Sequence, residues 1–281
     1  MRVIAASSPF DRALFYRGVG FLAERYRVEI APGTLDRTGF LAGSDETRLR
    51  ALDEALLDDG VRAVIAARGG YGALRIAHRA RWDVLARHPK WLVGFSDVTS
   101  LHLEALRVGV CSLHADNAGG LGRGDAHARA RFVHGLELPA SSRPFFGLST
   151  LRGGQAEGPL MGGNLTVLFS AHAAGRLRVP DGAVLFLEDV TEASYRIDRM
   201  LTALRLSGAL ERVSGVVLGD FTDCSPAPHG VAVEAVLEER LGELGIPVAR
   251  GLPAGHGRLN HPLLLGATVS LDASAGNLRW L

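Results

Sequence analysis

The sequence predicts an α/β protein in which parallel strands alternate with helices. Along the first half of the chain, short apolar runs alternate with amphipathic segments, as they do in βα units. A tight turn joins an apolar run to a helical segment twice, at residues 69–72 and at Ser96. The 281 residues suffice for two domains, and 47% of them are hydrophobic, which provides material for a sizeable core.

The first half begins with an expected strand at residues 2–6 and continues with a helix at 44–59. Ser44 is the expected N-cap of that helix, Leu49, Leu52 and Leu56 share one face, and Gly60 ends it. The further elements expected in this half are a strand at 61–67, a helix after Gly72, a strand at 91–95 and a helix from Val98.

Periodicity is lost between residues 139 and 160, where Pro, Gly and Ser become frequent, as in a linker. We therefore expect an N-terminal domain at 1–140, a linker at 141–158 and a C-terminal domain at 159–281. The elements expected in the second half are strands at 183–187, 215–218 and 268–272, and helices at 192–206 and 230–244.

Composition excludes several classes of partner. The formal net charge of +1 provides no overall attraction to nucleic acid or to an anionic membrane, so neither is expected. The N-terminus has no long apolar region with a cleavage site, which favours a cytoplasmic protein. Cys111 and Cys224 form no C-x-x-C pair, so neither a disulfide framework nor a structural zinc site is expected, and no cofactor is indicated.

Ser96 follows an apolar run directly and precedes a helical segment. A serine at such a turn projects from the carboxyl end of the sheet, beside the backbone N–H groups of the helix start, and is placed to act as a nucleophile. The alternative is a serine that caps the helix, because the local pattern G-F-S-D-V is not G-x-S-x-G. Spacing alone leaves both interpretations open.

Two further candidates for catalysis occur in the second half. Glu188 ends an apolar run, where α/β enzymes keep catalytic carboxylates; an exposed strand-end charge or a helix cap is the alternative. His256 lies between two glycines, on a loop that leaves its ring accessible. His261 suggests zinc, but the ten histidines form neither a ligand cluster nor H-E-x-x-H, and we expect no metal.

Two glycine-rich turns suit either a ligand or close backbone packing. The turn at 68–72 (R-G-G-Y-G) follows a strand, and its bare amides suit an anion. It lacks the Lys-Ser/Thr ending of a P-loop and the G-x-G-x-x-G of a dinucleotide fold. The segment 162–165 (G-G-N-L) has the same two interpretations.

Taken together, the sequence resembles the LD-carboxypeptidase family of serine peptidases, which includes muropeptide carboxypeptidases and microcin-immunity proteins. The similar motifs run nearly from end to end, at residues 6–9, 42–48, 68–72, 94–102, 158–165, 185–190, 195–201 and 255–256 with Asn260.

The resemblance implies a doubly wound N-terminal α/β domain, a smaller β-rich α/β C-terminal domain and an active site in the cleft between them. It maps the nucleophile to Ser96, the acid to Glu188 and the histidine to His256. It also implies a muropeptide tetrapeptide as the substrate, from which terminal D-alanine is removed during cell-wall recycling, and a homodimer.

These roles lead to further expectations about the site. The backbone N–H groups of Gly70 and Asp97 are expected to bind the oxyanion, because one lies on a glycine turn and the other directly follows the nucleophile. An arginine, Arg68 or Arg75, suits the terminal carboxylate. The residues expected to contact the substrate are Arg68, Tyr71 and Asn164.

The sequence departs from the family at residues 114–117, where many relatives have H-G-P and this chain has H-A-D-N. The change alters backbone freedom and local charge, so it leaves substrate selection open. Three other functions stay open: a microcin-immunity amidase that cleaves peptidyl-nucleotide antibiotics, a non-catalytic binding protein, and a nucleotide-dependent oxidoreductase. The short chain disfavours the first, and the missing dinucleotide motif disfavours the last.

Overall fold

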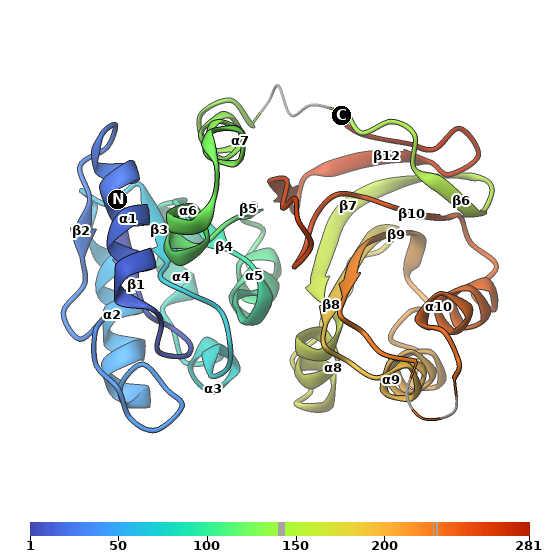
Figure 1. Cartoon of the computed structure of the whole chain (residues 1–281), viewed down its shortest axis with the longest axis horizontal. Helices are drawn as coiled ribbons and strands as arrows, with labels where there is room; N and C mark the ends of the chain where they lie inside the picture. The colour runs from blue at the N-terminus through green and yellow to red at the C-terminus, as the bar shows by residue number, and fades with distance from the viewer. Residues whose placement is uncertain (140–143, 227, 229) are drawn as a thin grey trace. The chain divides into compact units, whose positions relative to one another are not determined.

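A computed structural model describes residues 1–139, 144–226, 228 and 230–281. The chain divides into two compact units, each with its own sheet. The first unit comprises Met1–Glu137 and His261–Leu264, and the second comprises Leu138–Asn260 and Leu265–Leu281. Figure 1 shows the elements of both units along the chain.

The first unit contains a six-stranded sheet in the order β11-β5-β4-β3-β1-β2. The pairs β2–β1, β1–β3, β3–β4 and β4–β5 are all parallel. The strands are β1 (Arg2–Ile4), β2 (Glu29–Ile30), β3 (Ala63–Ala66), β4 (Trp91–Gly94), β5 (Ser112–His114) and β11 (Leu263–Leu265). Strand β1 lies between β2 and β3, so the strands that follow it in sequence are added first on one side of β1 and then on the other. The loops after β1 and β3 are adjacent at this topological switch point.

Helices cover both faces of this sheet. Alternate residues of β3 enter different cores: Val64 packs in a cluster with Leu52 and Leu101, and Ile65 packs in a second cluster with Phe15 and Phe132. The helices are α1 (Arg12–Ala23), α2 (Asp45–Leu57), α3 (Ala73–Ala77), α4 (Trp82–Arg87), α5 (Thr99–Arg107), α6 (Ala118–Arg123) and α7 (Ala126–Glu137). The first unit is therefore doubly wound, as the resemblance to the LD-carboxypeptidase family implied.

The second unit contains a seven-stranded mixed sheet in the order β13-β12-β7-β8-β9-β10-β6. Strands β7, β8, β9 and β10 are parallel neighbours, and antiparallel pairs extend the sheet on both sides. Helices α8, α9 and α10 lie on one face (Figure 1). The strands are β6 (Ser149–Arg152), β7 (Gln155–Asn164), β8 (Ala183–Val190), β9 (Val213–Thr222), β10 (Val248–Arg250), β12 (Thr268–Asp272) and β13 (Asn277–Trp280). The helices are α8 (Leu165–Ala173), α9 (Ser194–Leu206) and α10 (Val233–Gly242).

Several predicted elements agree closely with the structure. Helix α2 has Ser44 as its N-cap, and the Ser44 hydroxyl accepts a hydrogen bond of 3.1 Å from the Thr47 backbone N–H. The strand expected at 268–272 is β12. Helix boundaries here follow capping and apolar periodicity, which are local properties of the sequence.

Two strands are longer than predicted, and the expected linker is partly strand. Strands β8 and β9 continue past their apolar runs, because Asp189 pairs with Phe221 and Val190 pairs with Thr222. Of the linker expected at 141–158, residues 141–143 lie outside the described residues. The rest includes β6 and the start of β7. The Gly, Pro and Ser residues of this segment masked its strand character. Strand β6 lies at the edge of the sheet, where backbone pairing does not require an apolar run.

Candidate active site

The serine of the G-F-S-D motif has an unusual backbone conformation. Ser96 has φ = 66°, in the left-handed region that non-glycine residues seldom adopt. It is the first residue of a short 3₁₀ helix (Ser96–Val98) whose N-cap is Phe95. The interpretation of Ser96 as a helix N-cap is therefore wrong. A partly exposed serine on a strained strand-to-helix turn suits a nucleophile.

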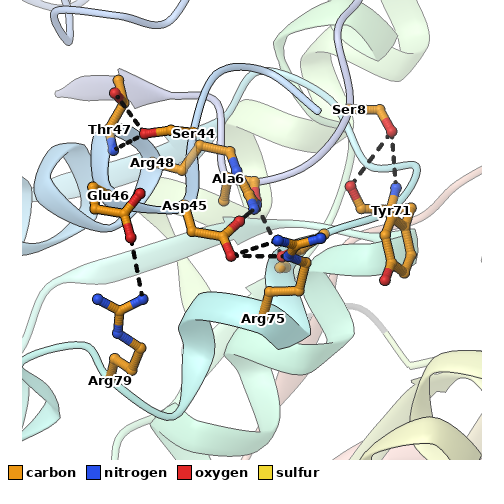
Figure 2. Close-up of polar contacts among 12 residues, drawn as sticks. Ala6, Ser8, Ser44, Asp45, Glu46, Thr47, Arg48, Tyr71, Arg75 and Arg79 are labelled. Atoms are coloured by element: carbon orange, nitrogen blue, oxygen red, sulfur yellow. Dashed lines mark hydrogen bonds and ion pairs between the residues drawn. The ribbon is translucent and has the colours of Figure 1, made fainter. Parts of the chain in front are cut away.

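The glycine turn after β3 lies against this serine. A β-carbon on Gly69 would be 2.7 Å from Ser96 Cβ, and one on Gly70, which has φ = 108°, would be 2.6 Å from Ser8 Oγ. Ser8 Oγ accepts a hydrogen bond of 3.1 Å from the Tyr71 N–H and donates one of 3.4 Å to the Tyr71 carbonyl (Figure 2). The loops of the switch point thus hold the turn at 68–72 beside Ser96.

Asp97 links the turn that carries Ser96 to the start of helix α3. Its side chain is buried, and Oδ2 accepts a hydrogen bond of 2.7 Å from the N–H of Ala73, the first residue of α3. Burial raises the pKa of Asp97, although this hydrogen bond favours the charged form. The expected oxyanion roles of the Gly70 and Asp97 N–H groups stay predictions.

Arg48 of α2 ties the same loops together from within the core. Its buried guanidinium donates hydrogen bonds to the Ala6 carbonyl, to the Gly72 carbonyl at 2.9 Å and to Asp45 (Figure 2). Asp45 also pairs with Arg75, at 2.8 Å from Nη2 to Oδ2. Arg75, one candidate for the substrate carboxylate, therefore already has a carboxylate partner.

The remaining candidates of the first unit lie at its surface. Arg68 is exposed, and its Nη1 donates a hydrogen bond of 2.6 Å to the Pro9 carbonyl. Tyr71 is 53% exposed, and its ring meets that of Phe40 edge to face. Both residues belong to the glycine turn at 68–72, and both side chains are accessible at the surface of the first unit.

The sequence analysis assigned no role to His102, which lies on α5 and contacts the backbone two residues before Ser96. His102 is fully buried; its Nε2 is 2.9 Å from the Gly94 carbonyl and its Nδ1 is 2.8 Å from Ser112 Oγ. Because a carbonyl only accepts, Nε2 carries the proton and Nδ1 accepts from the Ser112 hydroxyl. Burial lowers the pKa of His102 to about 4, so its ring is neutral at pH 7. The only signal for it in the sequence was its place on the helix that follows Ser96.

The second unit pairs the two other candidates. His256 Nδ1 is 2.7 Å from Glu188 Oε2. Glu188 is fully buried within β8, so the interpretations as an exposed strand-end charge and as a helix cap are both wrong. Burial raises the pKa of Glu188, and the bond to His256 opposes this shift. A carboxylate on Nδ1 orients the ring and leaves Nε2 to exchange a proton with another group.

Asn164 and Asp189 form a polar cluster beside Glu188. Asn164 is the N-cap of α8, and its Nδ2 donates a hydrogen bond of 3.0 Å to Asp189 Oδ1. Asp189 Oδ2 also accepts from the Thr166 N–H and hydroxyl. Asn164 is only 5% exposed, and a substrate contact by it stays a prediction. A β-carbon on Gly162 would lie 2.0 Å from the Phe186 carbonyl oxygen, so this glycine serves close strand packing.

The described residues contain no group of three or more His, Cys, Asp or Glu side chains arranged to hold a metal ion. In the same part of the chain, no helix has both the length and the apolar character that a membrane crossing requires. Each unit by itself holds part of the predicted catalytic set: the first has a serine on a strained turn, and the second has a carboxylate–imidazole pair.

Comparison with known proteins identifies the class. Residues 1–115 match the model of the LD-carboxypeptidase N-terminal domain, and residues 157–271 match that of the LD-carboxypeptidase C-terminal domain. Since these models cover most of the chain, the protein belongs to the LD-carboxypeptidase family.

Individual relatives agree with this assignment. The chain is 42% identical to a putative carboxypeptidase of Synechocystis, with 91% of this chain and 85% of the relative covered. It is 34% identical to the murein tetrapeptide carboxypeptidase of Pseudomonas aeruginosa, with coverages of 87% and 82%. The crystal structure of muramoyltetrapeptide carboxypeptidase from Oxalobacter formigenes superposes with a TM-score of 0.87 at 32% identity, covering 99% of this chain and 96% of that one.

The microcin-immunity branch shares the fold at lower identity. The structure of the microcin C7 self-immunity protein MccF in complex with glutamyl sulfamoyl guanosine superposes with a TM-score of 0.89 at 19% identity. It covers 100% of this chain and 96% of that one. This likeness shows the fold alone.

Proposed function

We propose that this protein is a serine-type LD-carboxypeptidase that removes the C-terminal D-amino acid from a muropeptide tetrapeptide. The observation that carries the proposal is the 2.7 Å contact between Glu188 and His256 in a chain of this family. The strained turn at Ser96 supports the role of nucleophile. Relatives named murein tetrapeptide carboxypeptidase and muramoyltetrapeptide carboxypeptidase support the substrate.

In the proposed mechanism, Ser96 Oγ attacks the carbonyl that joins an L-configured centre to the terminal D-amino acid. His256 Nε2 accepts the serine proton, and Glu188 stabilises the resulting imidazolium. The tetrahedral intermediate collapses with cleavage of the C–N bond, and His256 returns the proton to the leaving amine. Water then hydrolyses the acyl-serine by the same route and regenerates Ser96.

The backbone N–H groups of Gly70 and Asp97 are the proposed oxyanion donors. Gly70 lies on the turn that contacts Ser8, and Asp97 directly follows Ser96 in a short helix. Their N–H groups need no reorganisation when charge develops, because Ser8 and the Asp97 side chain already fix both turns.

Substrate contacts complete the proposal. Exposed Arg68 provides a charged donor for the terminal carboxylate, and Tyr71 and Asn164 are the further proposed contacts. We place the reaction in cytoplasmic cell-wall recycling by a homodimer that needs no cofactor, nucleic acid or membrane partner.

The test is release of free D-alanine from L-Ala-γ-D-Glu-meso-diaminopimelyl-D-Ala by the purified protein, with Ser96→Ala and His256→Ala measured beside it. We expect turnover by the wild type and none by either variant. Labelling with a serine-directed fluorophosphonate is expected for the wild type and lost in Ser96→Ala.

Two outcomes contradict the proposal in different ways. If the folded wild type is labelled but releases no D-alanine, the protein is a serine hydrolase and the muropeptide is not its substrate. Peptidyl-nucleotides are then the next substrates to test. A wild type that binds the tetrapeptide without labelling or turnover is a binding protein.

A further inference from the structure

The loop that carries His256 is held by the end of strand β9. The Asp220 N–H donates a hydrogen bond of 3.0 Å to the Ala254 carbonyl. A β-carbon on Gly219 would lie 2.2 Å from the same carbonyl oxygen. The residues just before His256 therefore lie directly on β9, and the position of the loop depends on this strand.

On the far side of the histidine, the loop meets the Asp220 carboxylate. A β-carbon on Gly257 would be 2.2 Å from Asp220 Oδ2 and 2.4 Å from Cγ. The Gly257 N–H donates a hydrogen bond to this carboxylate. Burial raises the pKa of Asp220, and the Gly257 bond and the charge of His256 oppose this shift. Asp220 thus touches the residue next to the histidine and interacts electrostatically with its ring.

Gly255, on the other side of His256 in the sequence, packs against the Glu188 carboxylate. A β-carbon on Gly255, which has φ = 123°, would be 2.8 Å from Glu188 Oε2. The Gly255 N–H donates a hydrogen bond of 3.0 Å to Asn260 Oδ1. His256 therefore lies between two glycines, each of which packs against one carboxylate, from β8 on one side and β9 on the other.

We propose that Asp220 is a positioning residue for His256: its carboxylate fixes the G-H-G loop through the Gly257 N–H and adds a second negative charge near the imidazolium. This inference rests on the proposed role of His256 as the base. Glu188 holds the ring itself, and Asp220 holds the backbone that carries the ring.

Among the described residues, Glu188 from β8 and Asp220 from β9 are charged groups that interact with His256. Asp189 on β8 interacts with Glu188, and exposed Arg258 follows on the same loop. Because Asp220 carries a negative charge that interacts with His256, its neutralisation makes the imidazolium less stable.

The test compares Asp220→Asn, which keeps an oxygen acceptor but loses the charge, with Asp220→Ala, which loses both. Asp223→Asn is the control, because Asp223 is an exposed carboxylate at the same strand end, and asparagine tolerates its left-handed φ of 52°. The measurements are hydrogen exchange of the peptide covering residues 252–260, and kcat and KM for D-alanine release as functions of pH.

For Asp220→Ala we expect about tenfold faster exchange in this loop and a fall in kcat of about 10- to 100-fold, with KM nearly unchanged. For Asp220→Asn we expect near wild-type exchange and an acidic limb of kcat/KM moved by about half a pH unit to lower pH. A purely structural role would not move that limb.

Unchanged exchange in Asp220→Ala would overturn the role of the hydrogen bond, and an unmoved acidic limb in Asp220→Asn would overturn the role of the charge. If the wild type releases no D-alanine, the proposed function fails. The exchange measurement still decides whether Asp220 fixes the loop.

Discussion

Gly69 and Ser96 are in direct contact: a β-carbon built on Gly69 would lie 2.7 Å from Ser96 Cβ and 3.0 Å from Ser96 Oγ. Separations below 3.0 Å require one of the two groups to shift. A side chain at residue 69 would therefore compete with Ser96 for the same space. The observed position of Ser96 therefore requires glycine at residue 69.

Gly69→Ala is expected to lower kcat for D-alanine release by about 10- to 100-fold, because the added methyl group displaces Ser96 from its reactive position. The rate of fluorophosphonate labelling should fall with it. Circular dichroism is expected to show a folded protein, since the only separation below 3.0 Å is to one small side chain and the Phe95 carbonyl oxygen lies at 3.1 Å.

Gly20→Ala is the matched control, because within the described chain no atom outside the helix's own backbone lies within 4 Å of a β-carbon at Gly20 in α1. It should keep full activity and gain up to about 1 kcal/mol of stability from helix propensity. Equal activity of both variants would contradict a constraint of Gly69 on Ser96.

Glu188→Gln is expected to reduce kcat by about 10⁴-fold, because the amide cannot stabilise the imidazolium. Burial raises the pKa of Glu188, so the folded protein binds this proton more tightly than the unfolded chain does. The ionised group therefore lowers stability as the pH rises through its folded pKa. We expect the variant to be at least as stable as the wild type at pH 7, with an advantage that shrinks toward pH 4.

Thermal unfolding between pH 4 and 8 measures this difference, and Glu157→Gln on the exposed part of β7 is the control. A melting temperature for Glu188→Gln that falls further below the wild type as the pH rises would contradict the prediction.

His102 should give the opposite pH dependence. Its pKa is about 4 in the folded protein against an ordinary value of 6.5, so protonation favours the unfolded chain. Its contribution to stability is complete above pH 6.5 and declines by about 3 kcal/mol as the pH falls toward 4. Urea unfolding is expected to show that the gap between the wild type and His102→Gln narrows over this range.

His88→Gln, at an exposed position, should show a constant gap from the wild type over the same range. A constant gap for His102→Gln as well would mean that the buried ring does not resist protonation.

Arg48→Ala is expected to destabilise the first unit by about 3 to 5 kcal/mol in urea unfolding, because it leaves buried acceptors without their cation. Arg50→Ala, two residues along the same helix and exposed, is expected to change stability by less than about 0.5 kcal/mol. Similar small losses in both variants would refute a structural role for Arg48.

Local patterns predicted much of the architecture. Alternating apolar runs and helical periodicity identified the βα units, and the cap at Ser44 located the start of α2. The edge strand β6 was missed, because its residues in S-T-L-R are mostly exposed and leave no apolar run. The return of residues 261–264 to the first unit was also missed, since no local signal indicates which sheet a short apolar strand joins.

The sequence was sufficient to predict the candidate catalytic residues, but not the backbone conformation and the tertiary contacts that hold them in place. The motifs led to Ser96, Glu188 and His256, of which the structure pairs the last two. The left-handed backbone of Ser96 and the contact of Asp220 with Gly257 depend on segments far apart in the chain. Such tertiary contacts leave no periodicity or spacing in the sequence.

The position of β11 has a consequence for dividing the gene. Strand β11 supplies the neighbour of β5 in the first sheet, although it is encoded more than a hundred residues after Glu137. A fragment ending at Glu137 would leave β5 with an unpaired edge, which favours aggregation. One crossover between relatives would likewise combine a sheet from one parent with an edge strand from the other. Productive shuffling must therefore exchange residues 261–265 together with the N-terminal half.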